Sequence, residues 1–433
     1  MESKNIKKTF CKYVSLNVLG MMGISCYILA DTFFVARGIG SNGLAALNLA
    51  IPIYSFIYGV GLMIGMGGAT RFSISKSKTV FTQSLYFILI LSGVFFATGL
   101  LLSDRLASLL GTNATTHQMT STYLKVVLCF SPAFMLNSLI TCFIRNDGNP
   151  RLAMIAMLLG SFSNIILDYV FIFIFGMGMF GAAVATGIAP AISLTVLSTH
   201  MVKKKNSFHL VRSKPALWVF CDVSSLGVYS LVTELSSGIV MIIFNSIILG
   251  LAGNLGVAAY GIIANIALVI LSIFTGIAQG MQPIISRNYG VGRHGNIREV
   301  LKYGIVVTCA FAVLIYIISF TFAEPIVSIF NKEQDLRLSG MAIEGLRIYF
   351  TAFLFIGINI LLATYFGSVD EPKNAFVISI LRGFIVTIPL VFILSEFLGM
   401  TGVWIAVPFA ELIVSVFSVG MLTQKKLTPV AKS

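Results

Sequence analysis

The sequence predicts an all-α polytopic membrane protein with twelve transmembrane helices, arranged as two six-helix bundles related by a pseudo-two-fold axis along the membrane normal. Three observations predict this fold class: an apolar composition, twelve long apolar stretches and an internal repeat. Hydrophobic residues make up 57 % of the 433 residues and charged residues only 10 %, whereas a soluble protein carries roughly 25 % charged residues. The composition therefore excludes a cytosolic enzyme, a disordered protein and a secreted disulfide scaffold.

The apolar stretches are each long enough for a membrane-crossing helix, which needs about 20 residues. They lie near residues 13–36, 45–70, 80–102, 122–144, 151–175, 179–201, 223–249, 256–283, 300–323, 341–366, 374–396 and 401–422. Runs such as residues 84–102 are too long for the ~10-residue alternating strands of a membrane barrel. The first stretch also exceeds the ~7–15-residue core of a signal peptide, so we expect no cleavable signal.

The basic residues indicate the orientation of the chain in the membrane. With the N-terminus inside, the inner segments hold 22 Lys and Arg and the outer loops hold 4. Because cytoplasmic loops carry the excess of Lys and Arg, both termini are expected on the cytoplasmic side of a bacterial plasma membrane. The net charge of +13 lies in short loops between apolar runs, so it does not indicate a nucleic-acid partner. We expect a multi-pass monomer that contacts membrane lipid.

An internal repeat divides the chain in two. Three pairs of segments resemble one another at offsets of 213, 222 and 221 residues, in the same order along each half: 42–47 with 255–260, 149–153 with 371–375, and 178–182 with 399–403. The longest polar interruption, with a basic cluster and a proline, falls at the midpoint. The predicted domains are an N-terminal lobe (1–202), a cytoplasmic basic linker (203–216) and a C-terminal lobe (217–433). Since each half has an even number of spans, the halves share one orientation, and a binding site is expected near the midplane between them.

Carboxylates inside the spans are the strongest functional signal, because each costs about 2.5–3.5 kcal/mol at a span centre. Asp31 and Asp168 lie in the first and fifth spans, and Thr186 lies in the sixth. At ~1.5 Å per residue, all three sit about 8–11 Å below the outer boundary. Asn164 lies one turn from Asp168 on the same helix face. These oxygens suit a small cation, such as Na⁺, or a proton shared between neighbouring carboxylates.

The C-terminal half lacks this cluster and carries Glu234 and Glu411 inside its own spans. Both carboxylates are candidates for attracting a cationic substrate, with Arg382 as a further candidate in the substrate site. The alternative for Glu411 is a structural ion pair with Arg382. Ion handling is therefore predicted in the first half.

The cysteines and histidines indicate no metal or redox chemistry. The six cysteines form no C-x-x-C pair and do not combine with histidine at ligand spacing, so they predict neither a redox motif nor a zinc site. The four histidines lie in or near loops, where we expect solvated surface. No nucleophile–base pair is evident, so neither an enzyme nor a cofactor is predicted.

Four motifs resemble those of a known family. Residues 31–37 (DTFFVAR), followed by 43–46 (GLAA), resemble the first-span signature of the multidrug and toxic compound extrusion (MATE) transporters. Residues 164–168, 181–186 and 279–286 resemble further segments of that family, with the second half most similar to its MepA-like bacterial branch. The resemblance covers nearly the whole chain. It departs at two places: the first span has glycines where some members have a proline, and the tenth span lacks the acidic residue of some relatives, with Asn359 as its most polar mid-span group.

The resemblance implies efflux of amphipathic organic cations, driven by inward Na⁺ or H⁺ movement as the two halves rock. It also implies a cation site on Asp31, Asn164, Asp168 and Thr186. The alternative within transport is a lipid-linked precursor flippase, which requires a strongly basic central cavity. A sensor or receptor requires a soluble domain, and no loop exceeds about 20 residues, about the length of one membrane-spanning helix. A single carboxylate cluster in one half of the chain fits a transporter with alternating access better than it fits a channel.

Overall fold

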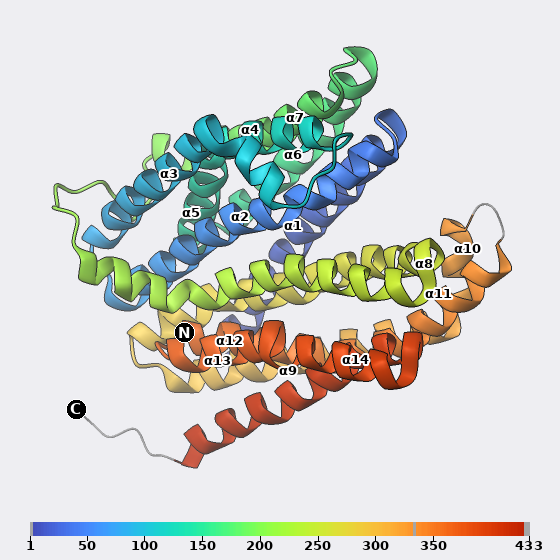
Figure 1. The fold of residues 1–433 in the computed structure, drawn as a ribbon. Helices are drawn as coiled ribbons and strands as arrows, with labels where there is room; N and C mark the ends of the chain where they lie inside the picture. The colour runs from blue at the N-terminus through green and yellow to red at the C-terminus, as the bar shows by residue number, and fades with distance from the viewer. Residues whose placement is uncertain (1–2, 332–334, 428–433) are drawn as a thin grey trace.

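The computed structural model describes residues 3–331 and 335–427, and every regular element in these ranges is a helix (Figure 1). In chain order the elements are α1 (Ser3–Gly38), α2 (Ser41–Ser75), α3 (Thr79–Leu109), α4 (His117–Cys129), α5 (Ser131–Asn146), α6 (Pro150–Tyr169), η1 (Val170–Ile174), α7 (Gly178–Val202), α8 (Leu217–Gly290), α9 (His294–Thr321), α10 (Ala323–Phe330), α11 (Leu336–Tyr349), η2 (Phe350–Ala352), α12 (Phe353–Ser368), α13 (Pro372–Ile380), η3 (Leu381–Ile385) and α14 (Thr387–Leu427).

The helix α8 is a hairpin of two spans. Its 74 residues would extend about 110 Å as one helix, far more than the ~30 Å hydrocarbon core. Gly253 has non-helical backbone angles (φ 60°) in its middle. A Cβ on Gly256 would lie 2.8 Å from the side chain of Ile248, although eight residues separate them and a straight helix would hold them about 12 Å apart. The chain therefore reverses at Gly253.

The same reversal occurs in α14 at Gly399 (φ 58°). A Cβ on Gly402 would lie 1.9 Å from the carbonyl oxygen of Leu394, so these two residues face each other across a tight turn. Among the described residues nine segments are long and apolar enough to cross a membrane, and the pair α4–α5, bent by 47°, is a tenth. With two of these segments folded as hairpins, the predicted twelve spans are present.

The internal repeat is visible in the backbone of the turns. Three positions with left-handed φ angles recur at offsets of 213, 221 and 222 residues, the offsets of the sequence repeat. The pairs are Gly40 with Gly253, Gly178 with Gly399, and Gly148 with Asp370. Because few residues other than glycine adopt this conformation readily, the shared positions indicate that both halves use the same turn geometry.

The first half (α1–α7) and the second half (α8–α14), here called the N-lobe and the C-lobe, lie side by side and are joined at one end of the molecule (Figure 1). At this closed end, where α2 ends and α8 begins, glycines bring the lobes into backbone contact. A Cβ on Gly67 would lie 1.9 Å from the carbonyl oxygen of Val223, and one on Gly227 would lie 1.9 Å from that of Met63. Gly280 likewise admits the backbone of α1 at Val14.

The lobes diverge toward the opposite, open end, where the turns at Gly40 and Gly253 lie (Figure 1). The outer faces of the lobes carry many exposed large apolar side chains, among them Leu101, Leu109 and Phe397 at about 80 % exposure. Such a surface is unfavourable in water but suits the acyl chains of a bilayer. The molecule therefore combines a lipid-facing exterior with lobes that pack together at the closed end and diverge toward the other end.

The expectation of a solvated histidine is wrong for His200, which is buried. Its Nε2 lies 2.9 Å from Oδ2 of Asp147, and its Nδ1 lies 3.3 Å from the side-chain nitrogen of Asn149. The backbone N–H of Ser207, in the segment after α7, donates to the same Asp147 carboxylate at 2.9 Å. This segment folds back over the N-lobe and covers the histidine, a contact that sequence distance does not reveal.

Candidate functional site

The structure brings the four predicted N-lobe residues together inside the helices. Asp31 comes from α1, Asn164 and Asp168 from successive turns of α6, and Thr186 from α7. All four are at most 7 % exposed. Asp31 and Asp168 interact electrostatically. The spacing along each helix predicts this convergence, whereas a role in cation binding stays a prediction.

Hydrogen bonds fix three members of the cluster. With the Asn164 amide oriented to satisfy its neighbours, its nitrogen donates to Oδ2 of Asp168 at 3.1 Å and its oxygen accepts from the backbone N–H of Thr186 at 3.2 Å. The Thr186 hydroxyl donates to the carbonyl of Ala182 at 3.0 Å. These bonds tie α6 to α7 and hold one face of the Asp168 carboxylate.

Two carboxylate oxygens of the cluster have no partner. Oδ1 of Asp31 and Oδ1 of Asp168 are buried and make no hydrogen bond within the described residues. Burying a charged oxygen without a partner is costly, and two neighbouring negative charges add repulsion. The pair therefore suits the uptake of a positive charge, either a proton or a small cation such as Na⁺, which prefers oxygen ligands.

The cluster differs from a resident metal site. In the described part of the chain no three or more His, Cys, Asp or Glu side chains lie together as metal ligands. Two carboxylates with the neutral oxygens of Asn164 and Thr186 form a ligand set with only two negative groups. Such a set fits a transported cation that binds and leaves.

A group of tyrosines surrounds the cluster and was missed from the sequence. Tyr123 of α4 hydrogen-bonds to Thr186 and lies within electrostatic range of both carboxylates. Tyr27 lies one turn before Asp31, and its hydroxyl is 3.0 Å from that of Tyr54. The Tyr54 ring stacks on Tyr58 with centroids 6.2 Å apart. The available signal was the i, i+4 spacing of Tyr27 with Asp31 and of Tyr54 with Tyr58, since buried tyrosine hydroxyls usually require partners.

A small cavity of about 80 Å³ connects this region with the closed end. Tyr27, Tyr54, Tyr58 and Thr186 line one part of it, and Arg145 and Gln279 line another. Four lining side chains have buried polar atoms without partners: Asn137, Thr141, Arg145 and Ser193. A polar cavity of this size has room for a few water molecules but is far smaller than the ~300–1,000 Å³ pockets that hold drug-sized ligands.

Glu234 lies on α8 where the C-lobe meets the N-lobe. A Cβ on Gly59 of α2 would lie 3.2 Å from the Cβ of Glu234, so the two helices are close here. Its charge acts on Tyr27 and Tyr58. The Glu234 carboxylate makes no hydrogen bond or ion pair within the described residues. The structure thus places an unpaired acidic group beside the tyrosines.

Glu411 and Arg382 pair with each other inside the C-lobe. Oε1 of Glu411 accepts from Nε of Arg382 at 2.5 Å, and Oε2 accepts from the side chain of Asn359 at 2.7 Å. The Asn359 oxygen accepts in turn from Ser415 and Ser418, each at 3.0 Å. This is the structural ion pair that we gave, from the sequence, as the alternative to a role of Glu411 in substrate binding. Asn359 of α12 thus donates to the Glu411 carboxylate of α14.

Polar networks join the lobes at the closed end. Arg71 of α2 pairs with Asp222 of α8 and, at 3.0 Å, with Asp370. Arg145, counted from the sequence among the inner-loop charges, is buried at 1 % exposure and donates to Asn17 at 2.9 Å and to Gln279 at 2.8 Å. A motif in the second half therefore supplies the partner of a buried cation in the first.

The side chain of Gln282, from the same motif, crosses the interface as well. Its nitrogen donates to Thr70 at 2.7 Å, and its oxygen accepts from Asn146 at 3.0 Å. The N-lobe and C-lobe are thus linked by buried hydrogen bonds in addition to the Arg71 ion pairs. Separation of the lobes at this end must break all of them.

Two six-helix halves, a lipid-facing exterior and buried carboxylates beside the lobe interface define the class of the molecule. It is a multi-pass membrane transporter, not an enzyme. The chain belongs to the MatE family, whose profile matches residues 18–170 and 230–393.

Individual relatives extend over nearly the whole chain. Multidrug export protein MepA of Staphylococcus aureus (strain MSSA476) is 28 % identical over 403 residues, which cover 91 % of this chain and 88 % of the relative. Among solved structures, the MATE multidrug transporter DinF-BH, solved as a ligand complex, is 28 % identical, with a TM-score of 0.90 and coverage of 98 % and 97 %. An outward-facing MATE family transporter of the MOP superfamily has the same fold, with a TM-score of 0.87, 22 % identity and coverage of 98 % and 97 %.

Proposed function

We propose that the protein is a cation-coupled multidrug efflux antiporter that exports amphipathic organic cations from a bacterial cell by alternating access, in exchange for inward Na⁺ or H⁺. The names of two relatives support the substrate class: MepA is a multidrug export protein, and DinF-BH is a multidrug transporter. We place the protein in the plasma membrane as a monomer, with an N-terminal lobe (1–202), a basic linker (203–216) and a C-terminal lobe (217–433).

The unpartnered oxygens of Asp31 and Asp168 carry the proposal. A proton or Na⁺ bound there would neutralise the pair, so its affinity depends on how closely the cluster is packed in each conformation. Each ligand shifts the conformational equilibrium by the difference between its affinities for the two states. If the drug and the cation favour different states, the binding of one promotes release of the other, and the two exchange across the membrane. Asn164 and Thr186 hold the carboxylates in place and supply neutral oxygens.

The two ends of the molecule support alternating access. The closed end is sealed by touching backbones and buried hydrogen bonds, whereas the lobes diverge at the other end (Figure 1). The excess of Lys and Arg predicts that the closed end and both termini face the cytoplasm. In this orientation the conformation is open outward, and Asp31 and Asp168 lie toward the open side.

For the drug, we propose a site at mid-depth between the lobes. Glu234 supplies a negative charge, and Tyr27 and Tyr58 lie within its electrostatic range. Aromatic faces attract organic cations, with about 0.5–2 kcal/mol per contact. Arg382 and Glu411 satisfy each other in the C-lobe, so they rank behind Glu234 as drug contacts. A flippase for a pyrophosphate lipid would need basic groups where Glu234 lies, so this acidic position favours a cationic substrate.

The test is ethidium efflux by the purified protein in liposomes. One series applies a Na⁺ gradient at equal pH, and a second applies a pH gradient without Na⁺. We expect one gradient to drive efflux in the wild type and neither to drive it in Asp31→Asn or Asp168→Asn. The matched control is Glu396→Gln, which neutralises an exposed carboxylate on α14 and should transport like the wild type. Wild-type coupling in both N-lobe variants would contradict the proposal.

A further inference from the structure

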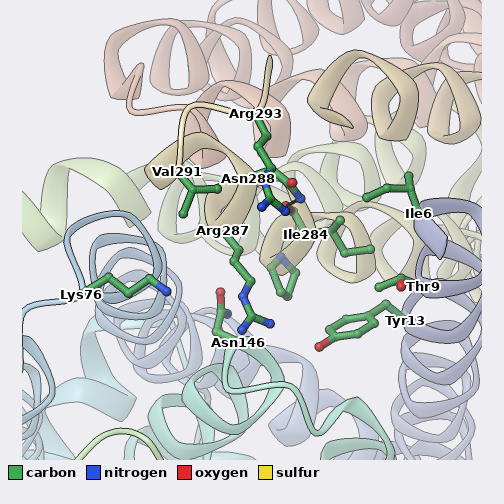
Figure 2. A pocket seen from close by; sticks show the side chains of 11 residues that line it. Ile6, Thr9, Tyr13, Lys76, Asn146, Ile284, Arg287, Asn288, Val291 and Arg293 are labelled. Carbon is green, nitrogen blue, oxygen red and sulfur yellow. Dashed lines mark hydrogen bonds between the residues drawn. The ribbon is translucent and has the colours of Figure 1, made fainter. Parts of the chain in front are cut away.

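A second cavity, of about 360 Å³, opens at the closed end between the lobes (Figure 2). The N-lobe contributes Tyr13 from α1, Lys76 from the end of α2 and Asn146 from α5. The C-lobe contributes Arg287 from the last turn of α8 and Arg293 just before α9. Figure 2 shows the Arg287 guanidinium between Asn146 and Tyr13, with the Lys76 side chain directed toward the same space.

The charged side chains that line this cavity are all basic. Lys76, Arg287 and Arg293 line it, and none of the eleven lining residues is acidic. None of the three cations forms an ion pair within the described residues, in contrast to Arg71 nearby, which has two carboxylate partners. The carboxylate of Asp147, which acts electrostatically on Tyr13, is already held by His200 and Ser207. Lys76, Arg287 and Arg293 are exposed, so water and salt screen part of their mutual repulsion. An anion bound between them would relieve the rest.

The hydroxyl of Tyr13 adds a neutral hydrogen-bond donor to the cavity. The side chain is 8 % exposed and lines the cavity, and its hydroxyl makes no hydrogen bond within the described residues. The neighbouring amides are occupied: Asn146 bonds to Gln282 and Ser73, and Asn288 bonds to Asn296. The free donors of the cavity are therefore the Tyr13 hydroxyl and the three cationic side chains.

This donor set matches a phosphate group. Guanidinium groups bind phosphate oxygens in a bidentate manner, and lysine acts as a point charge beside them. The apolar side chains of Ile6, Ile284 and Val291 also line the cavity, beside these donors, which suits the glycerol and upper acyl segment of an anionic lipid. We propose that the closed-end cavity is a binding site for a phosphate-bearing anion, held by Arg287, Arg293, Lys76 and the Tyr13 hydroxyl.

The site has a conformational consequence, which rests on the alternating-access cycle proposed above. Its donors come from both lobes, with Tyr13 and Lys76 on one side and the two arginines on the other. Separation of the lobes at this end would divide the donor set. The anion therefore binds most tightly when this end is closed and shifts the equilibrium toward that state.

The binding test uses the full-length protein in an uncharged detergent with three probes: inorganic phosphate, dihexanoyl phosphatidylglycerol and dihexanoyl phosphatidylcholine. The measurement is the rise of the thermal unfolding midpoint with probe concentration. We expect phosphatidylglycerol to stabilise the wild type. Its apparent affinity should fall roughly tenfold or more in Arg287→Gln, because a charge-assisted hydrogen bond is lost. Arg287→Lys should retain part of the affinity, and Tyr13→Phe should lose a smaller part.

Lys302→Gln is the matched control, since Lys302 is an exposed cation on α9 that does not line the cavity. If inorganic phosphate raises the unfolding midpoint and Arg287→Gln weakens this effect, the site is supported and its ligand is a soluble anion. Stabilisation by phosphatidylglycerol alone supports it and identifies a lipid. The proposal is overturned if neither phosphate compound stabilises the protein, if phosphatidylcholine acts equally, or if Lys302→Gln weakens binding as much as Arg287→Gln.

Hydrogen exchange separates the binding site from its conformational effect. Bound phosphatidylglycerol should slow amide exchange in residues 13–18 and 276–290, which face each other at the closed end, in the wild type but not in Arg287→Gln. Binding without this protection would overturn the preference for the closed state. Both measurements are independent of drug transport, so a failure of the anion site is distinguishable from a failure of the efflux proposal.

Discussion

The two lobes each bury a polar cluster that contains carboxylates, and the clusters differ in how many of their atoms have partners. In the C-lobe, both oxygens of Glu411 are bonded, to Arg382 and to Asn359, which two serines bond in turn. In the N-lobe, Asp31 and Asp168 each keep one buried oxygen without a partner among the described residues. Buried charge in a membrane protein is thus structural in one lobe and available for binding in the other.

The comparison teaches that the intramembrane position of a carboxylate does not decide its role. Both clusters lie in equivalent halves of a repeated fold, at positions where a charge is costly. What separates them is the local supply of cations and donors. A satisfied network fixes the structure, whereas an incomplete one leaves room for a transported ion.

The largest expected effect comes from removing the cation of the satisfied cluster. Arg382→Met should lower the free energy of unfolding by about 3–5 kcal/mol, because it leaves the buried Glu411 carboxylate without its counter-charge. Denaturant unfolding in mixed micelles measures this loss. The double variant Arg382→Met/Glu411→Gln removes both charges and should recover most of the stability. A single variant that loses less than about 1 kcal/mol would show that the pair is not structural.

The second prediction concerns the incomplete cluster. Asp168→Asn should abolish coupled efflux while it leaves the free energy of unfolding unchanged or raises it by about 1–3 kcal/mol, since it removes a buried charge that has an unpartnered oxygen and repels Asp31. Efflux in liposomes and unfolding of the same preparation measure the two quantities. If Asp168→Asn destabilises the protein as much as Arg382→Met does, the contrast between the lobes fails.

A smaller effect is expected at the edge of the N-lobe cluster. Tyr123→Phe removes the hydrogen bond to Thr186, which is worth about 1 kcal/mol, so the apparent affinity for the coupling ion should fall about fivefold. Efflux rates measured against Na⁺ concentration or pH report this shift. Tyr316→Phe, a partly exposed tyrosine on α9, is the control and should leave the curve in place. Equal shifts in both variants would rule out a specific contribution of Tyr123.

The smallest effect should follow from an ion-pair cluster whose side chains are accessible to water. Arg71 and its partners Asp222 and Asp370 are each 21–32 % exposed at the side chain. Arg71→Gln should therefore cost only about 0–1 kcal/mol and should speed amide exchange near the end of α2. A loss as large as that of Arg382→Met would mean that pairing alone, and not burial, sets the energy of these clusters.

Much of the fold and part of the site follow from the sequence, because both depend on strong local signals. Apolar stretches of membrane-spanning length determine the twelve spans, and the glycines at Gly40, Gly253 and Gly399 mark turns that require left-handed backbone angles. Asp31 and Asp168 are conspicuous because a charge within a span is rare. Helix spacing then places Asn164 beside Asp168.

The remaining features depend on contacts between distant segments. In the sequence, Tyr27 and Tyr123 look like ordinary packing residues of apolar helices. Only the assembled helices show that their hydroxyls lie near the carboxylates. Arg145 ends a span next to a polar turn and resembles a loop charge until Gln279 of the other lobe meets it. His200 is covered by a segment that returns over it. Apart from the i, i+4 spacing of Tyr27 with Asp31, these contacts have no periodic signal in the sequence.

The turn at Asp370 shows how the two halves differ at one position of the repeat. Its counterpart in the first half is Gly148, and both positions have left-handed backbone angles. An aspartate tolerates this conformation at a modest cost, typically of about 1 kcal/mol, and its carboxylate reaches Arg71 across the lobes. The same backbone geometry thus carries a glycine in the first half and, in the second half, a side chain that links the two lobes.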